Sequence, residues 1–153
     1  MQLAQLNIAR LVAPAGDPKV APFFAALDRI NTLGEQSPGF VWRLKDDVTG
    51  DATSFNPYDD DRLIINLSVW ESVAALQDFV FRSDHAGFMR RRREWFERTQ
   101  VATTCLWWID DGEHPTLSDA TDRLEHLRVH GPTAQAFGFA AAEKFPPGSH
   151  SAG

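Results

Sequence analysis

Apolar and polar side chains alternate along four short stretches of this chain. Alternation predicts a β-strand, because successive side chains of a strand point to opposite faces of a sheet. In the third stretch one row is wholly apolar, whereas the other row mixes apolar with polar residues: Ile64, Asn66, Ser68 and Trp70. The four predicted strands cover residues 3–11, 40–45, 63–70 and 101–109.

Apolar residues spaced three and four apart predict helices between these strands. The first helix begins at Asp17-Pro18, where a capping residue precedes a proline, and ends at Gly34. A second helix runs from Val73 to Val80, and a further helical stretch follows Ser83-Asp84. The segment 46–61 is rich in Asp, Gly, Asn and Pro, which predicts a long loop.

The predicted elements follow the order β-α-β-β-α-β, which is the split βαβ pattern of a ferredoxin-like fold. Beyond it, Ser118 is expected to cap a helix that stops at Gly131-Pro132, and residues 137–139 alternate in a short final strand. The sequence therefore predicts one α+β domain over residues 1–145, with an extra C-terminal helix and strand and a loose tail at 146–153. An antiparallel sheet with helices on one side leaves an apolar face to cover, so we expect a homodimer.

Composition and charge narrow the class of protein. The 153 residues carry a net charge of −6 with a pI of about 5.3, which argues against nucleic-acid binding. No apolar run approaches the roughly 20 residues that span a membrane. The single cysteine excludes an internal disulfide and fits a reducing compartment, so we expect a cytoplasmic protein.

Several polar clusters have ordinary explanations. The run 90–93 is four arginines, which point in four directions on a helix, so it predicts solvated surface with at most one arginine reaching a pocket. His126 and His130 have the spacing of two metal ligands, but no third ligand accompanies them and His130 suits a helix C-terminus. The acidic run 59–61 lacks the spacing of a calcium loop and is interpreted as a turn.

Two reactive residue types have both a structural and a functional interpretation. Cys105 has no basic sequence neighbour, so it is expected to be a small buried residue, or a contact residue if its strand face lines a cavity. His85 opens the predicted third helix and either caps it or donates a hydrogen bond.

The unusual feature of the composition is aromatic: eleven Phe and five Trp accompany a single Tyr. Buried indole and phenol groups need hydrogen-bond partners, which favours the edge of a cavity over a dry core. Apolar walls with a few polar groups are typical of a small-molecule site. The sequence contains no phosphate loop, dinucleotide fingerprint, Ser-His-Asp set or zinc motif, so we expect chemistry that relies on orienting a hydrophobic substrate, with no cofactor.

Motifs along most of the chain carry a family resemblance. They are residues 66–72 (NLSVWES), 88–96 (FMRRRREWF), 106–108 (LWW), 124–127 (LEHL) and 130–132 (HGP). The chain resembles a domain-of-unknown-function family placed in the dimeric α/β-barrel superfamily, beside the antibiotic-biosynthesis monooxygenases. The resemblance implies a homodimer with a pocket between sheet and helices. It extends to small cyclases of bridged macrolide polyketide pathways, which guide (6+4) and (4+2) cycloadditions.

The resulting hypothesis is a cofactor-independent cyclase acting on a hydrophobic polyene polyketide. In it Tyr58, Asn66 and Trp70 are the catalytic residues, and the substrate-binding residues are Trp42, His85, Met89, Cys105 and Trp107. Two alternatives stay open. One is a cofactor-free monooxygenase on an aromatic polyketide, with haem binding through His85 as a variant, and the other is a non-catalytic protein that binds a hydrophobic ligand.

Overall fold

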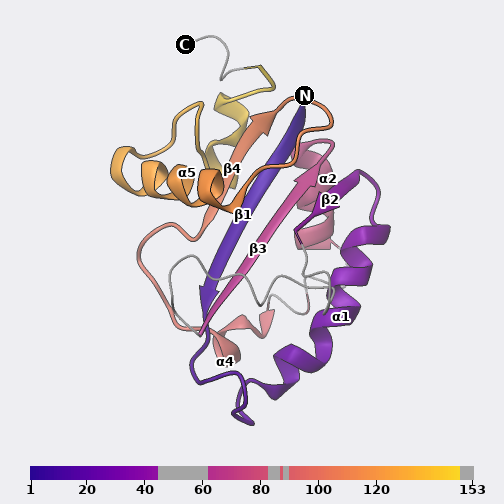
Figure 1. Cartoon of the computed structure of the whole chain (residues 1–153), viewed down its shortest axis with the longest axis vertical. Coiled ribbons are helices and arrows are strands. Elements are labelled where there is room, and N and C mark those ends of the chain that lie inside the picture. The colour runs from indigo at the N-terminus through magenta and orange to yellow at the C-terminus, as the bar shows by residue number, and fades with distance from the viewer. Residues whose placement is uncertain (45–61, 83–86, 88–89, 149–153) are drawn as a thin grey trace.

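The computed structural model describes residues 1–44, 62–82, 87 and 90–148 (Figure 1). Its strands β1 (Gln2–Arg10), β2 (Phe40–Arg43), β3 (Leu63–Trp70) and β4 (Thr104–Ile109) form one antiparallel sheet in the order β2-β3-β1-β4. This order, with a helix after β1 and helices after β3, is that of a ferredoxin-like fold. The predicted α+β class is confirmed.

The helices connect and cover the sheet. They are α1 (Ala21–Gln36), α2 (Val73–Gln77) with its π-helical continuation η1 (Asp78–Arg82), α4 (Arg92–Trp95), α5 (Leu117–His130) and the 3-10 helix η2 (Phe139–Lys144). In Figure 1, α5 crosses the near side of β4 and β1, whereas α1 lies beyond β2 at the other edge of the sheet. No described helix has both the length and the apolar character needed to cross a membrane.

Local signals decide where the later helices begin and end. The Ser72 side chain accepts a hydrogen bond from the backbone N–H of Ala75 and caps α2. Helix α5 is capped in the same way by Thr116, which accepts from Asp119, so the cap predicted at Ser118 was two residues too late. The predicted stop is confirmed, since Gly131 ends α5 with a φ of 74°.

Helix α1 differs from its prediction at both ends. Asp17 accepts a hydrogen bond from the backbone N–H of Lys19 and forms a turn, so the helix proper begins only at Ala21. At the other end, Gly34 lies inside the helix, which continues to Gln36. A Cβ on Gly34 would lie 3.3 Å from the ring of Phe79, so this glycine permits the ring to approach closely.

The predicted final strand is reduced to one bridge. Phe137 exchanges backbone hydrogen bonds of 2.7 and 3.0 Å with Leu106, after which the chain turns into η2. The turn packs the C-terminal segment onto β4, where the indole N–H of Trp108 donates to the carbonyl oxygen of Phe145 at 2.8 Å. The C-terminal segment is thus held to β4 by side-chain packing and not by the continued backbone pairing of a strand.

The sheet has two unlike faces. The core face consists of alternate residues packed against α5: Ala4, Leu6, Ile8, Ile65, Leu67, Val69, Cys105, Trp107 and Ile109. The pocket face consists of the intervening residues: Leu3, Gln5, Asn7, Ala9, Ile64, Asn66, Ser68, Trp70, Thr104, Leu106 and Trp108. Helix α5 covers the core face with Ala120, Leu124 and Leu127. Helices α1, α2, η1 and η2 lie against the pocket face.

Candidate functional site

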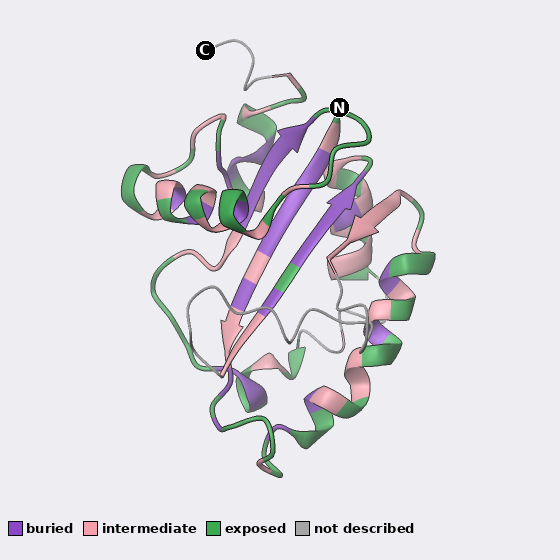
Figure 2. Cartoon of the chain, in the orientation of Figure 1, coloured by how far each residue is buried: buried purple, intermediate pink, exposed green. Residues whose placement is uncertain are grey.

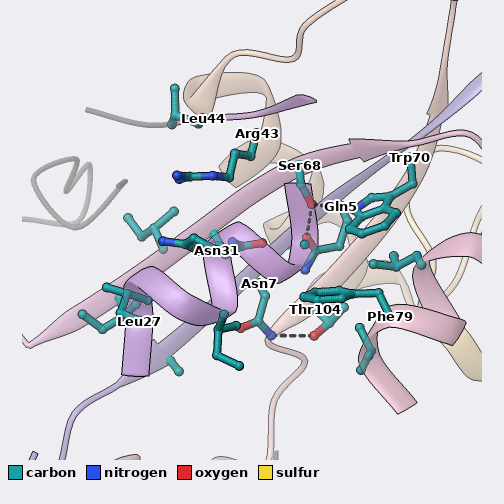
Figure 3. Close-up of a pocket in the computed structure, with 18 of the residues that line it drawn as sticks. Gln5, Asn7, Leu27, Asn31, Arg43, Leu44, Ser68, Trp70, Phe79 and Thr104 are labelled. Atoms are coloured by element: carbon teal, nitrogen blue, oxygen red, sulfur yellow. Dashed lines mark hydrogen bonds between the residues drawn. The ribbon is translucent and has the colours of Figure 1, made fainter. Parts of the chain in front are cut away.

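A cavity of about 340 Å³ lies between the pocket face and the helices α1 and η1 (Figure 3). This volume is within the usual range for small-molecule sites, roughly 300–1,000 Å³. Its floor is the central part of β1 and β3. Its walls are largely aromatic and aliphatic. One wall includes η1, and π-helical turns, although rare, are frequently found at functional sites.

Polar side chains cross the middle of the floor in a row. Asn7 lies directly opposite Asn66 on β3 and opposite Thr104 on β4. The Asn7 amide nitrogen donates to the Thr104 hydroxyl at 2.8 Å (Figure 3). Asn66 is exposed, and β3 shows an exposed stretch midway along its length (Figure 2). It lies beyond the part of β3 that pairs with β2, which covers only residues 68–70, so solvent reaches the sheet here.

A second polar group lies next to this row and is buried. The indole N–H of Trp70 donates to the Ser68 hydroxyl at 3.0 Å, and that hydroxyl donates to Oε1 of Gln5 at 2.8 Å. Gln5 and Ser68 face each other across β1 and β3, and only 8% and 5% of their surfaces are exposed. The three side chains form one hydrogen-bonded chain in the cavity floor.

Aromatic packing forms the wall at the Trp70 end. The Trp70 ring stacks on Phe79 with centroids 5.3 Å apart and meets Phe40 edge-on at 5.4 Å. Gly34 on α1 leaves room for Phe79 in this position. At the opposite end the lining changes to Phe23, Leu27 and Phe96, so apolar walls flank the polar floor on both sides.

The charged groups of the described lining are arginines. Arg43 pairs with Glu35 at 2.6 Å, and Arg92 also lines the cavity. The other three arginines of the run 90–93 are exposed, as expected for a helix surface, and Arg92 is the one that reaches the pocket. The described lining contains no carboxylate, imidazole or thiol. This arrangement can bind a hydrophobic molecule, orient its polar groups and stabilise negative charge on an oxygen.

The structure places the predicted site residues in three groups. Asn66 and Trp70 line the cavity. Trp42, Cys105 and Trp107 pack with the core face, so the strand alternation separates them from the cavity. Tyr58, His85 and Met89 lie outside the described residues.

The three core-face residues have structural environments. Trp42 stacks on His114 with centroids 4.5 Å apart. Burial raises the pKa of the Cys105 thiol to about 12, against a smaller lowering by Arg123, so the thiol is neutral and a poor nucleophile. Trp107 is fully buried below the Arg123 guanidinium, whose carbon lies 5.4 Å from the ring centre.

Sequence reasoning missed the polar residues of β1 and β4. Gln5, Asn7 and Thr104 line the cavity and carry much of its hydrogen-bonding capacity. A signal existed in β1, where Gln5 and Asn7 alternate with the apolar Leu6 and Ile8. Asn66 and Ser68 alternate with apolar residues in the same way. Pairing the two strands would have placed Gln5 and Asn7 beside Ser68 and Asn66 on one face of the sheet.

The described residues offer no evident metal centre. They contain no group of three or more His, Cys, Asp or Glu side chains positioned to share an ion. His126 and His130 do lie close together, with ring centroids 4.5 Å apart, but they are only two ligands.

Comparison with known proteins identifies relatives by family and fold. Residues 2–152 match the family described as Domain of unknown function (DUF3291). No curated protein matches the sequence. Among solved structures, the chain is similar to SnoaB, a cofactor-independent oxygenase from Streptomyces nogalater, with 16% identity and a TM-score of 0.51; the match covers 76% of this chain and 96% of SnoaB.

Two further solved structures share the fold. A conserved protein from Methanosarcina mazei Go1 is 12% identical with a TM-score of 0.53, covering 72% of this chain and 94% of that one. Rv0793 from Mycobacterium tuberculosis is 15% identical with a TM-score of 0.51, covering 74% of this chain and all of the other (100%). At these identities the likeness concerns the fold alone.

Proposed function

Because this chain belongs to the DUF3291 family of domains of unknown function, its activity has to be inferred from its pocket, and we propose that it is a cofactor-independent cyclase. The substrate would be a hydrophobic polyene polyketide that folds in the cavity and closes by a pericyclic (6+4) or (4+2) cycloaddition. The homodimer predicted from the fold order is part of this proposal and is measurable by light scattering.

The observation that supports this proposal is the combination of aromatic walls with a floor of neutral hydrogen-bonding side chains. The walls at Trp70 and Phe79 suit a flat, conjugated chain. A cycloaddition moves electron pairs within one molecule, so it needs a substrate held in its reactive conformation more than it needs a proton relay. Asn66, exposed in the floor, is placed to hydrogen bond a carbonyl that polarises the reacting chain.

The test measures conversion of a synthetic linear polyene β-keto thioester by the purified protein. A pericyclic product is an isomer, so mass spectrometry should show a new compound of unchanged mass. Replacing Asn66 by Leu keeps the size of the side chain and removes its hydrogen bonds, so we expect turnover to fall by about tenfold, within the range for one lost hydrogen bond in a site.

The matched control is Gln36→Leu, which makes the same kind of change at an exposed position outside the cavity. It should leave turnover unchanged. Full activity of Asn66→Leu, with both variants folded, would contradict the proposed role of the cavity floor.

A cofactor-free oxygenase acting on an aromatic polyketide is the second candidate. The fold shared with SnoaB and the guanidinium groups of Arg43 and Arg92 favour it, because such a reaction passes through an anionic form of the substrate that positive charge stabilises. In the same assay an oxygenase would consume dissolved oxygen and give a product heavier than the substrate. Binding of the thioester without any conversion would instead indicate a ligand-binding protein.

A further inference from the structure

The hydrogen-bonded chain from Trp70 through Ser68 to Gln5 has a fixed direction. An indole N–H can only donate, so the Ser68 oxygen must accept from Trp70. The single hydroxyl proton of Ser68 then goes to Oε1 of Gln5. The Gln5 amide therefore has its oxygen toward Ser68, where it is occupied by this hydrogen bond.

The remaining polar atom of Gln5 is therefore a donor. The described part of the chain gives Nε2 of Gln5 no hydrogen-bond partner. Among the described side chains, one nitrogen or oxygen atom is both inaccessible to solvent and without a hydrogen-bond partner, and that atom is the indole nitrogen of Trp107. Nε2 of Gln5 also has no partner, so it must be accessible to solvent. Gln5 is 92% buried and lines the cavity, so the accessible donor faces the cavity interior.

We propose that Gln5 is a specificity-determining residue whose amide donates to a carbonyl or enolate oxygen of the ligand. Trp70 and Ser68 act as positioning residues that keep this donor turned toward the cavity. The inference rests on the proposed use of the cavity as the substrate site and deepens it by naming the group recognised. A donor held in place beforehand costs little entropy when the ligand binds, which makes it selective for ligands with an acceptor at that point.

A buried Trp-Ser-Gln chain could also exist only to satisfy polar groups in the fold. The two roles differ in what they predict for ligand choice. A purely structural chain changes the affinities of all ligands together, whereas a recognition donor changes the preference for a carbonyl over a hydrocarbon of the same shape.

The experiment uses two probes that share a trigonal side-chain carbon and differ in the acceptor, 2-acetonaphthone and 2-isopropenylnaphthalene, in which a CH2 group replaces the carbonyl oxygen. Isothermal titration calorimetry with the full chain gives the ratio of their affinities. We expect the wild-type protein to prefer the ketone, and Gln5→Met to reduce that preference by about fivefold, the effect of one ordinary hydrogen bond. The infrared carbonyl stretch of the bound ketone should also move to higher frequency in Gln5→Met, because the bond to the donor is lost.

The positioning residues are tested by variants that leave Gln5 in place. Trp70→Phe keeps a stacked ring but lacks the N–H, and Ser68→Ala breaks the chain in its middle; each should lower the ketone preference by about threefold. Ser68→Thr keeps a hydroxyl at this position and should therefore retain the ketone preference of the wild-type protein. Trp108→Phe is the matched control, because Trp108 does not line the cavity and the substitution removes a hydrogen bond from its indole N–H to the Phe145 carbonyl oxygen. It should leave the preference unchanged.

The outcomes separate this inference from the proposed function. If both probes bind and the ketone preference is the same in wild type and Gln5→Met, the role of Gln5 is wrong while the cavity stays a ligand site. If neither probe binds the folded wild-type protein, the inference about Gln5 fails, whereas the proposed function is decided separately by conversion of the polyene thioester. If Gln5→Met and Ser68→Ala both lose the ketone preference and Ser68→Thr keeps it, the roles proposed for Gln5 and for its positioning residues are supported.

Discussion

The core face and the pocket face of the sheet are made by alternate residues of the same strands, yet they differ in what covers them. On the core face, Leu6, Leu67 and Cys105 are completely buried and meet the apolar side of α5. On the pocket face, Asn66 is exposed and its neighbours Asn7 and Thr104 are partly so. The pocket face is also buried at one end, where Leu3, Trp70, Leu106 and Trp108 pack in a second apolar cluster, so only its middle is free for polar residues and an open cavity.

The two faces also use polar groups in different ways. The pocket face contains hydrogen-bonded side chains whose spare donors and acceptors open onto the cavity. The core face has one indole, Trp107, whose N–H has no partner, and one thiol that burial keeps neutral. Stability is therefore expected to depend on the core face, and ligand selectivity on the pocket face.

The largest difference should come from the same substitution made on both sides of the sheet. Leu124→Ala removes a fully buried side chain of α5 from the core face and should lower the free energy of unfolding by about 3 kcal/mol. Leu27→Ala removes a half-buried side chain that already borders the cavity, and should cost only about 1 kcal/mol. Urea unfolding measures both values. Equal losses would mean that the pocket face is as tightly packed as the core face.

A pH-dependent effect should follow from Cys105 on the core face. Its pKa is raised by burial from 9.0 to about 12, so above pH 9 the unfolded chain releases a proton that the folded protein keeps. Stability from this group is complete below pH 9 and is lost as the pH rises toward 12, by about 1.4 kcal/mol per pH unit. The wild-type protein should thus lose about 2 kcal/mol more than Cys105→Ala between pH 9 and about pH 10.5. Parallel pH profiles of the two proteins would contradict the buried, neutral thiol.

The smallest effect is expected in the polar floor. Thr104→Val removes the acceptor of the Asn7 amide, but water in the open cavity can replace it, so the free energy of unfolding should change by about 0.5 kcal/mol or less. Urea unfolding under the conditions used for Leu124→Ala gives the comparison. A loss above about 2 kcal/mol would indicate that this part of the floor is dry and closed.

Much of the fold was predictable because its signals are local and repeated. The strand predicted at 63–70 has those bounds in the structure, since strong alternation and flanking polar residues define both ends. Gly34 was harder, because a glycine near a helix end can either stop the helix or allow close packing, and Phe79 decides between the two. The prediction of a final strand was wrong for a similar reason. Phe137 forms a single bridge with β4, and the chain then turns into η2, whose packing was not visible in the local sequence.

The site was predictable in part. Asn66 and Trp70 line the cavity, as the mixed row of the third strand suggested. Alternation placed Cys105 and Trp107 together on one face, but which face bears the helices of the pocket depends on pairings between distant segments. The polar residues of β1 and β4 became neighbours of Asn66 only through those pairings.

The sequence by itself determined the α+β class, the order of the elements and the existence of two unlike faces on the strands. These follow from the periodicity of side chains along the chain, which is set by local backbone geometry. The tertiary structure decided which face is closed by α5 and which opens as a cavity. It also joined Gln5, Ser68 and Trp70 into one chain, because hydrogen bonds between strands depend on a register that no single stretch of sequence contains.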